Sequence, residues 1–155
     1  MFKIRKTIRL KDYDYSSAGY YYITICTKDR KCILGKAEND SITVSKLGEI
    51  ITKNWNALVS MYKHIELNQY VVMPNHIHAI IVLNENCTKT IGDIICGYKS
   101  KTAREYNKIN KLNGEAIWQR GYYEHIIRNE KELYRIQKYI LENPIKWKYD
   151  RLYIS

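Results

Sequence analysis

Two apolar segments in the middle of the chain, residues 65–73 and 76–83, are separated only by Pro74 and Asn75. Both segments are rich in β-branched and aromatic side chains, which favour strands. The Pro-Asn pair favours a tight turn, because proline has no N–H to donate to a strand ladder. The pattern therefore predicts an antiparallel hairpin. A central hairpin of this kind indicates a fold built around an antiparallel sheet.

The second segment of this hairpin contains two histidines that flank one isoleucine, His76-Ile77-His78. Side chains alternate between the faces of a strand, so both imidazoles point to one side and Ile77 points to the other. Imidazole is the commonest metal ligand in proteins, and two on one face can share a cation when a third ligand comes from elsewhere. The residues themselves leave a second interpretation open, in which both histidines are ordinary hydrogen-bonded groups of a buried strand.

The rest of the chain alternates between strand and helix patterns. Strands are expected at residues 19–27, 116–119 and 122–128, a short polar hairpin reaches to about residue 44, and helices are expected at 45–61, 89–107 and 129–142. The order β-α-β-β-α-β-α predicts a single domain over residues 1–155. Its expected class is α+β, a ferredoxin-like or RRM-like sandwich in which an antiparallel sheet carries helices on one face and a C-terminal helix follows.

The last expected helix combines a start signal, a stop signal and two chemically useful side chains. Asn129 opens it with Glu132 as a capping-box partner, and Asn143 with the proline after it ends it. Tyr139 and Asn143 lie four residues apart, so they share one face beside the apolar stripe. A phenol and a carboxamide on this face meet the histidine pair if the helix lies beside that strand. Asn143 is also fully explained as the residue that caps the helix.

The balance of charge indicates a polyanionic partner. The chain has 26 lysines and arginines against 16 acidic residues, a formal net charge of +10. Nucleic acid is the first expectation and an anionic membrane surface the second, but no apolar run approaches the roughly 20 residues that span a bilayer. The basic stretch from Lys3 to Lys11 is expected either as an arm on nucleic acid or as a frayed end.

The N-terminus and the cysteines indicate the compartment. The first residues carry charges throughout and contain no apolar core of a signal peptide. The four cysteines show no Cys-x-x-Cys spacing and are expected as thiols: Cys26, Cys32, Cys87 and Cys96. A cytoplasmic protein without a membrane partner is therefore expected.

Three blocks of the chain together carry a family pattern. They are residues 72–78 (Val-Met-Pro-Asn-His-Ile-His), 118–128 (Trp-Gln-Arg-Gly-Tyr-Tyr-Glu-His-Ile-Ile-Arg) and 139–144 (Tyr-Ile-Leu-Glu-Asn-Pro). In this order and spacing they resemble the single-tyrosine HUH transposases of the insertion-sequence-200 type, and most of all their REP-associated tyrosine transposase (RAYT) branch. The resemblance covers residues 18–150, which is most of the chain.

The resemblance implies a metal-dependent enzyme that cleaves and rejoins single-stranded DNA with hairpin or palindromic ends. His76 and His78 would hold Mg²⁺ or Mn²⁺ with Asn143 as the third ligand, although many relatives carry glutamine at that third position. Tyr139 would attack a DNA phosphate and leave a 5′-phosphotyrosine intermediate with a free 3′-hydroxyl. A second strand's 3′-hydroxyl would then reverse the step and join new ends. Two other tyrosines, Tyr122 and Tyr123, compete with Tyr139 because they lie near a histidine on an adjacent expected strand.

Further residues have expected roles around this site. His125 is expected either to support a metal ligand or to contact DNA, and Arg135 to stabilise a phenolate at Tyr139. A basic DNA-binding surface is expected from Lys99, Lys101, Arg104, Arg120, Arg128 and Arg135. Insertion-sequence relatives are dimers in which the tyrosine helix serves the partner's metal site, whereas RAYT relatives act as monomers. The 118–128 block favours a monomer and leaves a homodimer open.

Two other functions compete with the transferase. A non-catalytic, RRM-like nucleic-acid-binding module would share the sandwich and would use tyrosines for base stacking. That module leaves the histidine pair and the pair of Tyr139 and Asn143 unexplained, and no aromatic ribonucleoprotein motif is present. A two-histidine phosphodiesterase would need a second His-x-Ser/Thr motif, which the sequence lacks.

Overall fold

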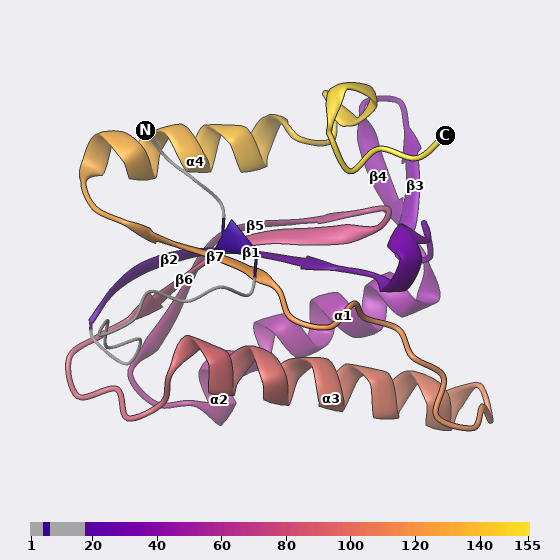
Figure 1. The fold of residues 1–155 in the computed structure, drawn as a ribbon, viewed down its shortest axis with the longest axis horizontal. Coiled ribbons are helices and arrows are strands. Elements are labelled where there is room, and N and C mark those ends of the chain that lie inside the picture. Colours follow the sequence, from indigo (N-terminus) through magenta and orange to yellow (C-terminus); the bar gives the residue numbers. More distant parts are fainter. Residues whose placement is uncertain (1–4, 7–17) are drawn as a thin grey trace.

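A five-stranded antiparallel sheet forms the centre of the computed structural model, which describes residues 5–6 and 18–155 (Figure 1). Its spatial order is β1-β7-β2-β6-β5, with β1 (Arg5–Lys6), β2 (Gly19–Cys26), β5 (Ile65–Met73), β6 (His76–Leu83) and β7 (Tyr123–Ile127). Without the short edge strand β1, this is the strand order of a ferredoxin-like sheet. The α+β class is confirmed. The expected basic arm lies outside the described residues, except for Arg5 and Lys6.

The predicted central hairpin is present with the predicted bounds. β5 pairs with β6 from Met73 opposite His76 down to Ile65 opposite Leu83, with one irregularity between Leu67 and Tyr70. On its other side β6 pairs with β2, which places Cys26 opposite His76 and Thr24 opposite His78. All eight residues of β6 are buried, because the strand is central in the sheet and covered on both faces.

Helices cover the two faces of the sheet unequally (Figure 1). One face carries α1 (Lys46–Asn56), α2 (Leu58–Met61) and α3 (Ile91–Ile109), and the opposite face carries α4 (Glu130–Glu142). The alternation of β6 divides its side chains accordingly: Ile77, Ala79 and Ile81 belong to the larger core, and Ile80 packs with Ile136 and Ile140 of α4. The histidine pair shares the face of Ile80, so α4 is the helix that can reach it.

Capping explains where the helices begin. Ser45 accepts a hydrogen bond from the Gly48 N–H, and Thr90 forms a reciprocal capping box with Asp93. Asn129 caps α4 as predicted by accepting from the Glu132 N–H, but the Glu132 carboxylate does not return to Asn129. It accepts from the Arg128 N–H instead, because His125 Nε2, 2.9 Å away, draws it toward β7.

The expected strand at 116–119 is reduced to a single bridge, between Thr27 and Trp118. The Lys99 ammonium holds this segment in place by donating to the carbonyls of Gln119 (2.6 Å) and Gly121 (2.7 Å). Backbone hydrogen bonds from Lys28 N–H to the Ile117 carbonyl and from Gln119 N–H to the Cys26 carbonyl flank the bridge, so Lys99 adds to a short backbone pairing.

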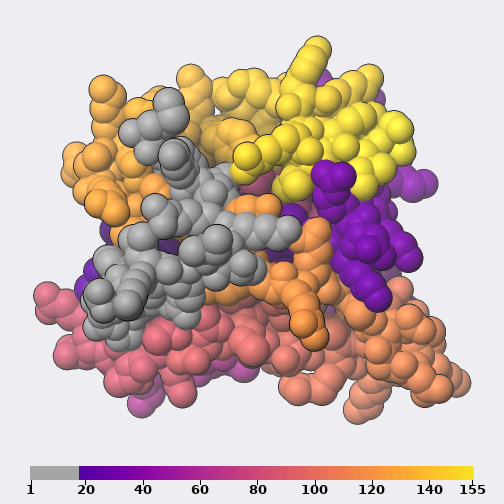
Figure 2. Space-filling view, in the orientation of Figure 1, coloured from indigo at the N-terminus to yellow at the C-terminus, as the bar shows by residue number. Residues whose placement is uncertain are grey.

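The remaining elements are short. The expected polar hairpin is a separate two-stranded sheet, β3 (Gly35–Glu38) with β4 (Ser41–Val44), and two 3₁₀ turns are η1 (Lys28–Arg30) and η2 (Trp147–Tyr149). Figure 2 shows the C-terminal residues, in yellow, against the segment that follows β2, in indigo. The four cysteines are thiols, as expected. Among the described residues, no helix has both the length and the apolar character that a membrane span requires.

Candidate metal and tyrosine site

The histidine pair is fully buried between β2, β6 and α4. The rings of His76 and His78 lie 4.5 Å apart between centroids, and their exposed fractions are 0% and 2%. His76 Nδ1 lies 2.7 Å from the Asn75 side-chain oxygen, so the ring donates through Nδ1, and its neutral form carries the lone pair on Nε2. The Asn75 amide in turn donates to the carbonyls of Arg30 and Leu152, which fixes the orientation of Asn75 and hence of His76.

His78 is oriented by two hydroxyl groups of β2. Its Nδ1 lies 2.8 Å from the Tyr22 hydroxyl and 2.9 Å from Thr24 Oγ1. In the Nδ1–H tautomer the ring donates to these oxygens, and Nε2 presents its lone pair to the interior. The Nε2 atoms of both histidines are buried and make no hydrogen bond to any described residue. Burial first, and then the neighbouring His76, holds the pKa of His78 well below its ordinary range, which keeps the ring in the neutral form that binds metals.

Asp150, which the sequence analysis did not single out, completes the cluster. Its Oδ2 lies 3.5 Å from His76 Nε2, and one donor atom each from His76, His78 and Asp150 lie within 4.8 Å of one another. Burial acts to raise the pKa of Asp150, but the adjacent His76 outweighs it and lowers that pKa to about 2. The carboxylate is therefore ionised across the physiological range. Two imidazoles and one carboxylate form a ligand set for a divalent cation.

Asn143, predicted as the third metal ligand, lies beside this cluster at the C-cap of α4. It is 3% exposed, and its amide donates to Asp150 Oδ2 at 3.1 Å. Its side-chain oxygen is buried and has no hydrogen-bond partner among the residues that the structure describes. Asn143 thus positions Asp150 and keeps an oxygen for a cation, so its role as a ligand stays a prediction.

Tyr139 lies next to the cluster of its own chain. Its ring is 5.4 Å from that of His78 between centroids, and 43% of the residue is exposed. Burial and the Asp150 carboxylate raise the pKa of Tyr139, while Arg151 and Asn143 act to lower it. Arg151 therefore supplies the positive charge that was expected from Arg135, which lies on the exposed surface of α4. A cavity of about 20 Å³ between Tyr139, His78 and Asp150 has room for one ion or water molecule.

Of the competing residues, one tyrosine reaches the small cavity, and the other tyrosine and His125 have partners elsewhere. Tyr123 lines the same small cavity, whereas the Tyr122 hydroxyl donates to Glu124 at 3.2 Å. His125 bonds to Glu132 and so ties β7 to the first turn of α4. It belongs to the support of the tyrosine helix, and the described metal-binding cluster does not include it.

The expected basic residues separate into two groups. Lys99 is half-buried, and burial lowers its pKa while its ammonium binds two carbonyls of the 119–121 segment. Lys101 is partly exposed, and the arginines are exposed to solvent: Arg104, Arg120, Arg128 and Arg135. Lys99 therefore has a structural task, and the arginines are the ones accessible to phosphate.

Replacing Lys99 by methionine is expected to lower the free energy of unfolding by about 1–3 kcal/mol, because two part-buried carbonyls lose their donor. Urea unfolding followed by circular dichroism measures this change. Lys101→Met is the matched control, since within the described part of the chain the Lys101 ammonium donates a hydrogen bond only to the exposed Met61 sulfur, at 3.6 Å, and the expected change is within about 0.5 kcal/mol. Equal losses in the two variants would remove the structural role of Lys99.

Acid is expected to destabilise the metal-free protein through His78. The unfolded chain binds a proton below the ordinary histidine pKa of 6.5, whereas the buried ring stays neutral. The stabilisation from neutral His78 is thus complete above pH 6.5 and is lost as the pH falls below it, by up to about 1.4 kcal/mol per pH unit. Denaturant unfolding in EDTA from pH 7.5 to 5 measures it. His78→Gln should flatten this slope and the exposed control His64→Asn should not; an unchanged slope in His78→Gln contradicts the assignment.

Comparisons with known proteins identify the family of the chain. The family model described as "Transposase IS200 like" matches residues 15–143. An uncharacterised Haemophilus influenzae protein is 34% identical over 97% of this chain and 94% of its own length. The REP-associated tyrosine transposase of Escherichia coli K12 is 32% identical over 85% of this chain and 70% of its own.

A solved structure shares the fold. A REP-associated tyrosine transposase bound to a REP hairpin matches with a TM-score of 0.68 at 21% identity, over 93% of this chain and 77% of that one. The family pattern that was expected from the three sequence blocks is confirmed. The chain therefore belongs to the family of IS200-like transposases, and within that family it resembles the REP-associated tyrosine transposases.

Proposed function

We propose that this transposase cleaves and rejoins single-stranded DNA through a covalent link to Tyr139, beside a divalent cation held by His76, His78 and Asp150. The observation that carries the proposal is the position of a part-exposed phenol next to a buried His-His-Asp cluster in one chain. Buried imidazole nitrogens without hydrogen-bond partners among the described residues fit a cation, because such atoms are otherwise costly to bury.

The proposed reaction exchanges one phosphodiester for another. The Tyr139 oxygen attacks phosphorus, the bond from phosphorus to the 3′-oxygen breaks, and the leaving strand ends in a 3′-hydroxyl. The downstream strand stays on the protein as a 5′-phosphotyrosine. A 3′-hydroxyl of another strand then attacks the same phosphorus and returns the phenol. The energy of the bond is kept in the intermediate, so no nucleotide hydrolysis is needed.

The protein's own groups act on the ionisation of the phenol in both directions, and burial, the largest influence, raises the pKa of Tyr139. Asp150 opposes ionisation and Arg151 favours it, and these two charges lie on the same C-terminal segment. Bound Mg²⁺ or Mn²⁺ would polarise the phosphate and offset the charge of Asp150. With that charge offset, burial would be left to raise the pKa of Tyr139, and Arg151 and Asn143 would act against it. The exposed part of Tyr139 is where a DNA phosphate reaches the oxygen.

The position of α4 argues against the non-catalytic alternative. RRM-like modules bind bases on the open face of their sheet. Here that face carries α4, and Tyr22 and Ile80 of the sheet are buried beneath Ile136 and Ile140. A stacking platform would need this face uncovered, whereas a tyrosine helix needs to be anchored on it.

The DNA partner is proposed to be a hairpin with single-stranded flanks. The net charge of +10 and the exposed arginines suit a polyanion. The structural relative was solved with a REP hairpin, which gives the shape of the expected substrate.

Strand transfer is tested with a hairpin oligonucleotide labelled at either end and incubated with protein and Mn²⁺. A protein band that survives denaturation should carry the label of the 3′-labelled oligonucleotide only, and peptide mass spectrometry should place it on Tyr139. The 5′-labelled oligonucleotide should release a free fragment with a 3′-hydroxyl. Cleavage without any adduct, or an adduct that carries the 5′ label, would overturn the proposed chemistry.

A single chain is proposed to hold a complete site, because Tyr139 lies beside His78 of the same chain. Mixing His76→Ala protein with Tyr139→Phe protein should therefore restore no adduct formation. Each variant alone serves as the baseline, and light scattering gives the mass in solution. Recovery of about half the wild-type adduct in the mixture would instead show that the tyrosine helix serves a partner.

A further inference from the structure

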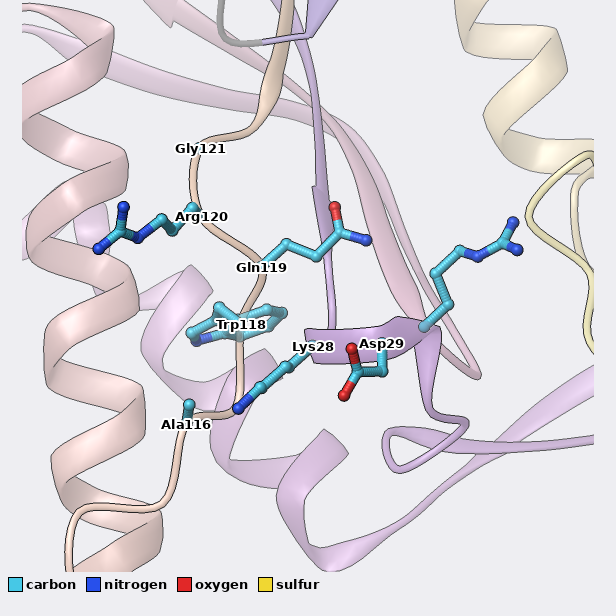
Figure 3. Close-up of a pocket in the computed structure, with 8 residues that line it drawn as sticks. Lys28, Asp29, Ala116, Trp118, Gln119, Arg120 and Gly121 are labelled. Atoms are coloured by element: carbon cyan, nitrogen blue, oxygen red, sulfur yellow. The ribbon is translucent and has the colours of Figure 1, made fainter.

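A groove of about 940 Å³ opens between the η1 turn and residues 116–121 (Figure 3). Three cations, one carboxylate, one amide and one indole line most of it: Lys28, Arg30, Arg120, Asp29, Gln119 and Trp118. Figure 3 shows Gln119 and Arg120 extending to opposite sides of their segment, while Lys28 and Asp29 extend from the facing turn. The volume is that of a site for a small molecule or for one unit of a polymer.

The turn on one side of this groove is built at a conformational cost. Asp29 and Arg30 are consecutive non-glycine residues in the left-handed region, with φ of 56° and 53°. Non-glycine residues in this region are uncommon, and strained ones gather at binding sites. Hydrogen bonds hold the turn, since Arg30 N–H donates to the Thr27 carbonyl and the Thr27 hydroxyl donates to the Lys31 carbonyl.

The groove adjoins the metal and tyrosine site through shared contacts. Thr27, which bridges to Trp118, follows Cys26, and Cys26 is paired with His76. The Asn75 side chain contacts both places at once: its amide donates to the Arg30 carbonyl, and its oxygen accepts from His76. These contacts make the groove a neighbour of the histidine-bearing end of β6.

We propose that this groove holds one unpaired nucleotide of the DNA next to the cleaved phosphate and reads the edge of its base. The proposal rests on the proposed function, because it places the nucleotide relative to the cleavage point. Lys28, Arg30 and Arg120 suit the flanking phosphates. Asp29 would repel a phosphate, but a carboxylate accepts from base amino groups and a glutamine amide can both donate and accept. Asp29 and Gln119 therefore select a base edge.

We expect the groove to recognise the edge of the base and not to stack on its face, because the Trp118 ring is buried. Trp118 is only 8% exposed, and its Nε1 donates to Thr102 Oγ1 at 3.0 Å. The ring is packed in the core and offers no open face to a base. The carbonyls of Gln119 and Gly121 are bound to Lys99, so the backbone that carries the Gln119 amide is held in position.

Fluorescence anisotropy in EDTA tests the groove without any cleavage. The probes are a labelled hairpin with a four-nucleotide single-stranded flank, the same hairpin with each flank base changed in turn, and the blunt hairpin. The wild type should bind the flanked hairpin more tightly than the blunt one and prefer one base at one flank position by about tenfold. Gln119→Ala and Asp29→Asn should remove that preference. Arg120→Ala should weaken all flanked hairpins equally and lower the salt slope by about one.

Lys36→Ala, on exposed β3, is the matched control and should change neither affinity nor preference. The groove side chains Asp29 and Arg120 are exposed, so thermal unfolding should show all variants folded. Retained base preference in both Gln119→Ala and Asp29→Asn would overturn the proposal. A competition experiment can also overturn it. If poly-glutamate displaces the flanked hairpin as effectively as an oligonucleotide of equal charge does, the groove binds acidic chains in general. If the base preference is intact but no Tyr139 adduct forms, the proposed strand transfer is contradicted and the proposed nucleotide site in the groove is not.

Discussion

Tyr139→Phe is expected to abolish the covalent protein–DNA adduct and to lower strand cleavage by about 10⁴-fold or more. The substitution removes only the oxygen that would attack phosphorus, and loss of a nucleophile costs enzymes on this order. The ring itself remains, so its contact with His78 and the packing of α4 stay intact. Denaturing gel electrophoresis of a 3′-labelled hairpin incubated with Mn²⁺ measures both adduct and cleavage.

Tyr134→Phe is the matched control, because Tyr134 lies on the same helix and is 69% exposed. It should keep wild-type adduct formation. Affinity for the hairpin should be unchanged in both variants, which separates the chemical step from binding. An adduct that persists in Tyr139→Phe would refute the assignment, and Tyr123, which lines the same small cavity, would be the next residue to replace.

The second large effect is expected from the cluster of His76, His78 and Asp150. Alanine at any of these positions should weaken Mn²⁺ binding by more than about 100-fold, because each removes one of three buried donors. EDTA should abolish adduct formation, and added Mn²⁺ should restore it in the wild type alone. Isothermal titration calorimetry gives the affinity. The Trp147 ring lies 6.0 Å from that of His76, so quenching of its fluorescence by Mn²⁺ gives a second measure.

Asp150→Ala and Asn143→Ala together decide the third ligand. The geometry predicts the larger loss of Mn²⁺ affinity for Asp150→Ala, and a smaller one for Asn143→Ala, whose amide positions the carboxylate. His64→Asn, at an exposed position, is the control for removal of an imidazole. Wild-type affinity in Asp150→Ala with a large loss in Asn143→Ala would restore the sequence-based ligand set. Adduct formation without any metal would refute the proposal that this cluster holds a cation needed for the reaction.

Local patterns accounted for much of the framework. The turn at Pro74 and Asn75, the alternation through His76 and His78, and the cap at Asn129 all depend on residues close together in the chain. Steric limits and hydrogen bonds over a few residues decide such features. For this reason the bounds of β5, β6 and α4 agree with the expected ones.

Features that depend on distant neighbours could not be predicted in the same way. The strand expected at 116–119 is a single bridge to Thr27 with a backbone hydrogen bond on either side of it, and beyond the bridge the Lys99 ammonium on α3 binds the carbonyls of Gln119 and Gly121. Glu132 was expected to return to Asn129 and instead bonds to His125 on β7. In both cases a side chain from another element supplies the partner, and only the packed fold determines that it is near.

The sequence by itself determined that two imidazoles lie on one strand face and that Tyr139 and Asn143 share one helix face, because 2.0- and 3.6-residue periods are local properties of the backbone. The tertiary structure decided which face of the sheet α4 covers. It also brought Asp150 and Arg151 from the C-terminal segment to the cluster. No spacing connects Asp150 to the histidines, since burial of Ile136, Ile140 and Trp147 is what carries the C-terminal segment across the sheet. A charge partner that arrives through the packing of apolar side chains leaves no periodic mark in the sequence.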